Sequence, residues 1–265
     1  MKRILKPDTY AISTLERYTG SNVSEFGSHI ILVNFNRYMD FFSETRNVEI
    51  KEGHWDAAHD KKNDISIINF GVGSPSAGIV AHCLSYLGHV ESVLMLGMCG
   101  GIDDELDIGD IIIPTASVRD EGTSMHYLQP NVPAQPSFWI NEICEKVVTR
   151  ESSEKPRSGI MLTTDYRMWE FDEEYIKYIL KHRIIAIDME IATLFSVAYA
   201  TSLPIGSIML VSDMPLKEGG IKSKESAKDV FKKYTDDHFE IGTKVIEEIK
   251  TRSKAQKVKR LWSEW

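Results

Sequence analysis

The feature that most constrains the fold of this chain is a set of seven short apolar runs separated by longer stretches. The runs are continuous rather than alternating in polarity, which is typical of strands covered on both faces. Each is bounded by Gly, Pro, Asp or a polar cluster. They lie at residues 30–35, 65–70, 92–97, 110–115, 158–163, 184–188 and 205–211. Strands that alternate with helices predict a three-layer α/β/α sandwich with a central mixed, twisted sheet.

Helical periodicity fills several of the intervals. After Ser74, one apolar face is expected to comprise Ile79, Val80, Cys83, Leu84 and Leu87. Gly88 is the expected stop of that helix. Residues 189–201 are apolar nearly all round, so this helix is expected to be buried. The last helix is predicted from a stripe formed by Val230, Tyr234, His238, Ile241, Val245 and Ile249.

The length of 265 residues, with 42% hydrophobic and 26% charged side chains, fits one large α/β domain. We therefore predict a single catalytic domain over 1–265. Residues 1–27 would form an N-terminal extension of helix and loop, and 251–265 a basic, solvated C-terminal tail. The net charge of −8 argues against nucleic acid as a partner.

Several classes of protein are excluded at this level. No run of about 18 apolar residues is present, so no membrane span is expected. The three cysteines show neither a disulfide framework nor zinc-ligand spacing, and the N-terminus lacks a signal peptide. A reducing, cytoplasmic location is the resulting expectation, with no metal and no cofactor.

Ligands of open α/β sheets bind outside the carboxyl ends of the strands, so the residues after each run are candidates. Two glycine loops occur there. In N-F-G-V-G-S-P-S (69–76), Gly71 and Gly73 permit positive φ, and Ser74 opens a helix whose N-terminus attracts anions. An ordinary glycine turn with a helix cap explains the same residues. In L-G-M-C-G-G-I (96–102), Cys99 and Gly100 would pack against a ligand.

Two further strand ends carry carboxylates. In I-A-I-D-M-E-I-A (185–192), Asp188 and Glu190 lie where a buried strand meets a buried helix. Glu190 either caps that helix or grips a sugar diol, since a carboxylate accepts two O–H donors. The run 205–211 delivers Asp213 to its end, where the aspartate either forms a turn before a proline or acts chemically.

The order G-x-C-G-G, G-D-I-I-I-P, D-M-E and V-S-D resembles the nucleoside phosphorylase/nucleosidase superfamily from about residue 65 to 250. Within it, the chain is most similar to the catalytic domain of AMP nucleosidases. The segments that carry this narrower resemblance are 33–42, 163–170, 186–193, 211–217 and 237–242. Longer AMP nucleosidases have an additional N-terminal regulatory domain, for which this chain has no room. A short, catalytic-domain-only form is expected.

The resemblance implies hydrolysis of AMP to adenine and ribose 5-phosphate. Asp213 would donate a proton to N7 of the purine, Glu190 would bind the 2′- and 3′-hydroxyls, and Met189 would pack against the ribose. A carboxyl group that donates near neutral pH must hold its proton longer than a free aspartate, and an apolar strand end provides such desolvation. The resemblance also implies a homo-oligomer, commonly a hexamer built as a trimer of dimers.

The base site is expected to include residues 163–170. Thr164 and Asp165 occupy the strand end, and Trp169 either stacks on adenine or packs the core. Arg167 either meets phosphate or orients Asp165. Phosphorylases carry an arginine two residues before the G-x-C-G loop, where this chain has Met95. This departure favours water as the nucleophile, held by the Gly71–Ser74 loop.

The 5′-phosphate of AMP requires a basic partner. Arg37, with Asn34 and Asn36, is the preferred candidate because it directly follows a predicted strand in the 33–42 segment, which resembles the AMP nucleosidases. The other candidates within the chain are Arg119, Lys222 and Lys217. Lys217 would alternatively position Asp213. A neighbouring subunit could contribute His29 or Arg46.

Two other functions remain open. One is that of a purine nucleoside phosphorylase, or of a nucleosidase that acts on methylthioadenosine and S-adenosylhomocysteine. Both kinds of enzyme share the D-M-E and V-S-D motifs but lack segments like 33–42 and 163–170. A non-catalytic nucleotide-binding module would have lost the acid or the diol-binding residue, whereas Asp213 and Glu190 are both present.

Overall fold

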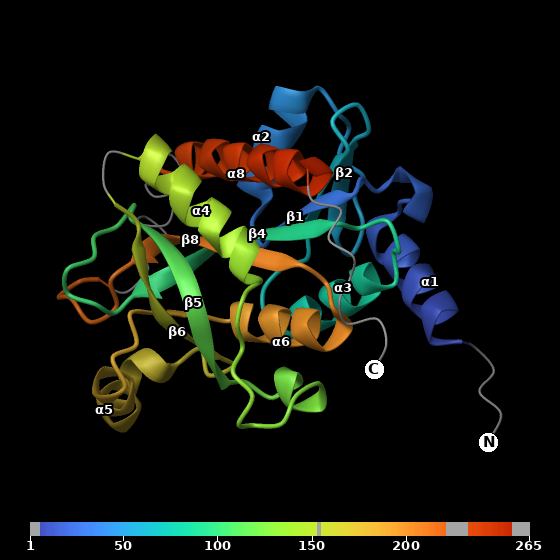
Figure 1. Cartoon of the computed structure of the whole chain (residues 1–265). Helices are drawn as coiled ribbons and strands as arrows, with labels where there is room; N and C mark the ends of the chain where they lie inside the picture. The colour runs from blue at the N-terminus through green and yellow to red at the C-terminus, as the bar shows by residue number, and fades with distance from the viewer. Residues whose placement is uncertain (1–5, 153–154, 221–232, 256–265) are drawn as a thin grey trace, which may run out of the picture.

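The computed structural model describes residues 6–152, 155–220 and 233–255. All seven predicted runs form strands of one eight-stranded sheet, with the order β2-β3-β1-β4-β7-β6-β5-β8 (Figure 1). The strands are β1 (His29–Val33), β2 (Asp56–Asp60), β3 (Ile65–Asn69), β4 (Ser92–Gly101), β5 (Ile111–Asp120), β6 (Arg157–Thr164), β7 (Ala186–Asp188) and β8 (Ile205–Asp213). The predicted mixed sheet is confirmed.

Helices cover both faces of this sheet (Figure 1). They are α1 (Pro7–Thr19), α2 (Asn36–Arg46), α3 (Ser74–Ser85), α4 (Phe138–Glu151), α5 (Glu173–Lys181), α6 (Ile191–Thr201) and α8 (Thr235–Ala255), with short 3-10 turns η1 (Val23–Glu25), η2 (Thr123–His126) and η3 (Trp169–Phe171). Because side chains alternate along a strand, Ile30 and Leu32 of β1 pack towards α1, α3 and α6. Ile31 and Val33 pack towards α2, α4 and α8.

Most of the helix predictions are confirmed. Helix α6 is buried from Ile191 to Ala198, and the stripe of α8 is buried from His238 to Ile249. Two details of α3 were wrong. Ile79 is 40% exposed, and the helix ends at Ser85, where the N–H of Tyr86 bonds back into the last turn, rather than at Gly88. Val230 and the tail residues 256–265 lie outside the described residues.

The sheet splits along one edge of β4. On the other edge, β8 accompanies β4 from Val93 to Gly100. On the split edge, parallel β1 pairs with β4 only as far as Leu96, and antiparallel β7 begins to pair at Gly100. Residues 97–99 therefore separate two strands that arrive from opposite directions. The residues after β1 and after β7 are brought together at this gap, which we call the β4 split.

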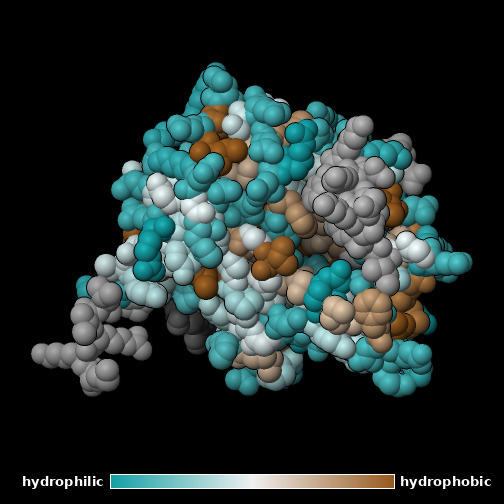
Figure 2. All heavy atoms as spheres, turned by 180° about the vertical axis from the view of Figure 1, so that it is seen from behind, coloured by the Kyte–Doolittle hydropathy of each residue, from teal (hydrophilic) through white to brown (hydrophobic). Residues whose placement is uncertain are grey.

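The surface and the cysteines of the described residues can be compared with what the composition predicts. In the described residues, no helix is both long and apolar enough to cross a bilayer. The face opposite the view of Figure 1 is mainly hydrophilic, with small scattered hydrophobic areas (Figure 2). Cys83, Cys99 and Cys144 are buried and none forms a disulfide bond, in keeping with the expectation from their spacing.

Candidate functional site

The first glycine loop lies at the β4 split. Gly71 and Gly73 have φ of 76° and 107°, which confirms the positive φ predicted for both. Gly73 is the N-cap residue of α3. The hydroxyl of Ser74 is buried and donates to the carbonyl of Met189 at 2.9 Å, so it ties the loop to the end of β7 rather than facing solvent.

Glu190 lies in the split between β1 and the glycine loop. Its side chain is buried, at 2% exposure. Oε1 accepts a hydrogen bond from the backbone N–H of Gly73 at 2.7 Å, and Oε2 faces the Asn34 amide Nδ2 at 3.4 Å. The strand ends of β1 and β7 and the first glycine loop thus converge on one carboxylate.

The helix-cap alternative for Glu190 is wrong, because Asp188 performs that role. Asp188 Oδ2 accepts from the backbone N–H groups of Glu190 and Ile191 at 3.0 and 2.7 Å, and Oδ1 accepts from the Thr163 hydroxyl at 2.6 Å. The Glu190 side chain makes no capping bond to α6. It is therefore left to face the split.

The electrostatics of this pair are unfavourable for two negative charges. Burial raises the pKa of Glu190, and the nearby charge of Asp188 raises it further. Burial also raises the pKa of Asp188, while the bonds from Thr163 and from the start of α6 oppose that rise. Glu190 is the less supported of the two carboxylates, so it gains most from new hydrogen-bond donors.

Asp213 ends β8 on the other side of β4. It is 7% exposed, and its Oδ1 accepts from the Ser212 hydroxyl at 2.6 Å. Gly100 lies opposite Asp213 in the register. A Cβ at Gly100 would stand 3.0 Å from Pro215 and 3.5 Å from Asp213 Oδ2, so only glycine leaves this close approach undisturbed.

Gly100 links the two candidate acids. It pairs with Asp213 of β8 on one edge and with Ile187 of β7 on the other. Neighbouring strands lie about 4.8 Å apart, so these two partner backbones are about 10 Å apart. Glu190 follows Ile187 by three residues, towards the split. The two carboxyl groups therefore come from strand ends that flank the same short stretch of β4.

The predicted base-site residues are only partly brought together. Thr163 pairs with Asp188, so Thr164 lies at the same end of the sheet as Met189. Asp165 is exposed and accepts from the backbone N–H of Gly122 at 3.0 Å. The predicted role of Arg167 in orienting Asp165 is wrong, because its guanidinium pairs with the Glu170 carboxylate at 2.7 Å.

Of the two alternatives for Trp169, stacking on adenine or packing in the core, the structure supports packing in the core. It is 4% exposed and lies in a cluster with Ile102, Leu162, Ile179, Ile184 and Ile187. A ring enclosed in this way has no face left for a base. Packing of η3 against α5 and the sheet explains the aromatic residue at this position without a substrate.

The predicted phosphate ligands are mostly engaged elsewhere. Arg37 donates Nε and a terminal nitrogen to the two carboxylate oxygens of Asp236, at 2.9 and 2.5 Å. Arg119 bonds the Ser124 hydroxyl and three loop carbonyls. Lys217 contacts the Leu106 carbonyl at 2.7 Å instead of positioning Asp213.

The two residues expected to contribute across a subunit interface have partners within the chain. His29 is 3% exposed, begins β1 at the end remote from the split, and bonds Ser92. Arg46 pairs with Asp60 at 3.2 Å. Lys222 lies outside the described residues.

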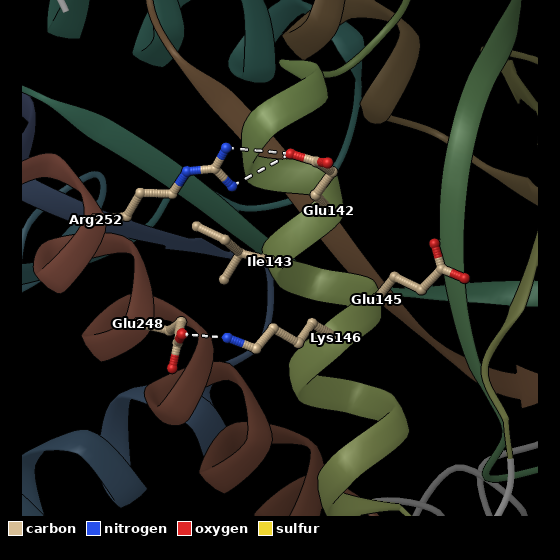
Figure 3. Close-up of a pocket in the computed structure, with 6 residues that line it drawn as sticks. All are labelled: Glu142, Ile143, Glu145, Lys146, Glu248 and Arg252. Carbon is tan, nitrogen blue, oxygen red and sulfur yellow. Dashed lines mark hydrogen bonds and ion pairs between the residues drawn. The ribbon is translucent and has the colours of Figure 1, made fainter. Parts of the chain in front are cut away.

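An open groove between α4 and α8 contains no predicted site residue (Figure 3). Its lining consists of Glu142, Ile143, Glu145, Lys146, Glu248 and Arg252. Lys146 pairs with Glu248 at 2.8 Å, and Arg252 pairs with Glu142 at 3.2 Å. Such exposed ion pairs are typical of a solvated helix surface.

Sequence reasoning missed the support of Asp188. The Thr163 hydroxyl donates to Asp188, lies 3.0 Å from the Ser117 hydroxyl, and accepts from the N–H of Ala192. This network fixes the start of α6 and with it Glu190. The available signal was the threonine pair at the end of the 158–163 run, which was assigned to the base instead.

Comparisons with known proteins find relatives over most of the chain. The AMP nucleosidase of Escherichia coli is 27% identical over 90% of this chain, which spans 58% of the length of that enzyme. The guanosine phosphorylase of Halorubrum lacusprofundi is 28% identical, over 74% of this chain and 78% of its own length. The crystal structure of the AMP nucleosidase from Bacteroides thetaiotaomicron superposes with a TM-score of 0.80 at 29% identity, covering 95% of this chain and all of that one.

The family model for the phosphorylase superfamily matches residues 29–247, from the first residue of β1 into α8. This range contains all eight strands, the β4 split and both candidate acids. The chain therefore belongs to the phosphorylase superfamily.

Proposed function

We propose that this protein hydrolyses the N-glycosidic bond of AMP, giving adenine and ribose 5-phosphate. The observation that carries the proposal is the pair of carboxyl groups, Asp213 and Glu190, at strand ends that flank Gly100 of β4. The likeness to AMP nucleosidases over 90% or more of the chain supports the choice of nucleotide.

Departure of the base is the step assigned to Asp213. Its proton goes to N7 of the purine, and the electron pair of the breaking C1′–N9 bond passes into the ring. A protonated base is a better leaving group, which is the contribution of a general acid. The near-complete burial of Asp213 at the end of an apolar strand keeps water from competing for this proton.

Glu190 is assigned to the sugar. Its carboxylate would accept the 2′- and 3′-hydroxyls, and its negative charge would stabilise the positive charge that develops on the ribose. Met189 directly precedes it and would pack against the ribose. Burial and the charge of Asp188 raise the pKa of Glu190, and two hydroxyl donors would oppose that rise by stabilising the carboxylate.

Water rather than inorganic phosphate is the proposed nucleophile. Met95 occupies the place of an arginine found in phosphorylases, and it is completely buried in the core of β4. A buried thioether offers no charge to an anion. This supports hydrolysis over phosphorolysis.

The 5′-phosphate is assigned to Arg37. Its ion pair with Asp236 is about one-third exposed on both sides, and such pairs contribute only about 0–1 kcal/mol. A dianionic phosphate can therefore displace Asp236. A second candidate substrate is a nucleoside without a phosphate. It is favoured by the fact that Arg37, Arg119 and Lys217 all have partners within the protein.

The test is release of adenine by the purified protein from AMP, adenosine and methylthioadenosine, each with and without inorganic phosphate. We expect AMP to be the preferred substrate and the rate to be independent of phosphate. Preference for adenosine or methylthioadenosine would assign the protein to the nucleoside-cleaving branch, and a requirement for phosphate would make it a phosphorylase.

A further inference from the structure

The amide of Asn34 has a defined orientation at the β4 split. Asn34 follows β1 and is 7% exposed. Its Nδ2 lies 3.4 Å from Glu190 Oε2, towards which it donates. When Glu190 is ionised, as its proposed role requires, the opposite amide orientation would place two acceptor oxygens against each other, so the ionised carboxylate determines which amide atom is which.

This orientation leaves the other amide atom without a partner. Asn34 Oδ1 is buried and accepts no hydrogen bond from the described residues. A buried acceptor of this kind is uncommon, and a donor that reaches it is stabilising. Phosphate oxygens are acceptors, so Asn34 Oδ1 does not suit the 5′-phosphate of a nucleotide. It suits an O–H group.

The number of hydrogens identifies which O–H group fits best. Asn34 Oδ1 and Glu190 Oε2 are two acceptors on neighbouring side chains. A ribose hydroxyl has one hydrogen and can satisfy only one of them. A water molecule has two hydrogens and can satisfy both acceptors, which leaves its lone pairs free for attack on a carbon atom.

We propose that Asn34 is a catalytic residue that holds the attacking water together with Glu190. This rests on the proposed hydrolysis. The water oxygen bonds to C1′ as the C1′–N9 bond breaks, the leaving electron pair is neutralised by the proton of Asp213 at N7, and a water proton passes to the Glu190 carboxylate. Glu190 then loses this proton to solvent and Asp213 regains one, so AMP and water give adenine and ribose 5-phosphate.

The test uses Asn34→Leu, which keeps the side-chain size and removes the acceptor. Asn141→Leu is the matched control, because Asn141 also donates to a carbonyl and also has a buried Oδ1 without a partner in the described residues, but lies in α4. Both variants are assayed with AMP in water–methanol mixtures, and ribose 5-phosphate and its methyl riboside are quantified. Methanol has one hydrogen, so the intact water site discriminates against it.

We expect Asn34→Leu to lower the hydrolysis rate about 100-fold. We also expect it to raise the ratio of methyl riboside to ribose 5-phosphate about tenfold, with wild-type values for Asn141→Leu. The product ratio does not depend on how much enzyme is folded, and Asn34→Ala should shift it in the same direction if the leucine variant does not fold.

A wild-type product ratio in both Asn34 variants would overturn the inference and leave the proposed hydrolysis standing. Adenine release by the wild type only in the presence of phosphate would overturn the water site but keep the bond cleavage. Absence of adenine release by the wild type under all conditions would remove the proposed function and the inference together.

Discussion

The β4 split and the groove between α4 and α8 both gather charged side chains, but they do so in opposite ways. In the groove, opposite charges lie at the surface in pairs such as Lys146–Glu248 (Figure 3). In the split, the carboxyl groups of Asp188 and Glu190 are close neighbours along the chain and both buried. Only Asp188 has donors that support its charge well.

This contrast separates a solvated helix surface from a place where the fold holds carboxyl groups away from water. Exposed ion pairs are weak and easily replaced. Burying like charges costs free energy, and proteins tend to retain such arrangements where a ligand or a reaction requires them. The split, whose residues come from the ends of β1 and β7 and from a glycine loop, is therefore the better candidate, and the following variants test the contrast.

The largest effect is expected from Asp213→Asn. The amide keeps the shape of the side chain but cannot give a proton to the purine, so kcat for AMP should fall about 1,000-fold while AMP still binds. Steady-state kinetics together with calorimetric binding measure the two quantities separately. Unchanged turnover would remove Asp213 as the proton donor.

Glu190→Gln should have the next largest effect, with a loss of about 100-fold in kcat/KM because the developing positive charge loses its partner. Binding of ribose 5-phosphate should weaken as well. A variant that lost rate without any loss of binding would contradict the assignment of Glu190 to the sugar hydroxyls.

The same variant should gain stability, with a defined dependence on pH. The folded pKa of Glu190 is raised, so the folded state holds this proton more tightly than the unfolded state. Stability is therefore lost as pH rises from the unfolded pKa of 4.5 through the folded value, and Glu190→Gln removes that loss. Thermal melts should show a larger gain in Tm at pH 8 than at pH 5. A gain independent of pH would contradict the electrostatic account.

A smaller and more selective effect is expected from Arg37→Ala. Loss of a charge-assisted contact to phosphate should raise KM for AMP about 10-fold or more and leave KM for adenosine nearly unchanged. Asp236→Asn is the companion variant, because it releases Arg37 from its present partner. Equal changes for both substrates would move the 5′-phosphate site elsewhere.

The smallest effect is expected in the groove. Lys146→Ala removes the exposed pair with Glu248, which should change the free energy of unfolding by less than about 1 kcal/mol. Adenine release should remain at the wild-type rate. A large loss of activity would make the groove part of the functional surface and would reverse the comparison.

Most strands could be predicted from the sequence, because continuous apolar runs rich in β-branched residues are typical of strands buried on both faces. Strand β2 was not predicted, because D-A-A-H-D contains no such run and forms an edge strand beside β3. Positive φ at Gly71 and Gly73 was predictable because glycine alone tolerates it easily. The split along β4 was not, since periodicity gives strands but not their partners.

The partners of charged residues were equally out of reach. Asp236 lies 199 positions from Arg37, and no local pattern connects them. The burial of Trp169 depends on η3 packing against the β6–β7 side of the sheet, which residue type alone does not reveal. The acids were found because they stand immediately after predicted strands, where position along the chain and position in the sheet agree.

The most direct measurement of the central claim is a crystal structure of Asp213→Asn soaked with AMP. The account predicts an intact nucleotide across β4, with purine N7 within hydrogen-bond distance of the side chain at position 213, about 2.6–3.2 Å, and the ribose hydroxyls on Glu190. A nucleotide that reaches only one of these two side chains, or that binds between α4 and α8, would contradict it.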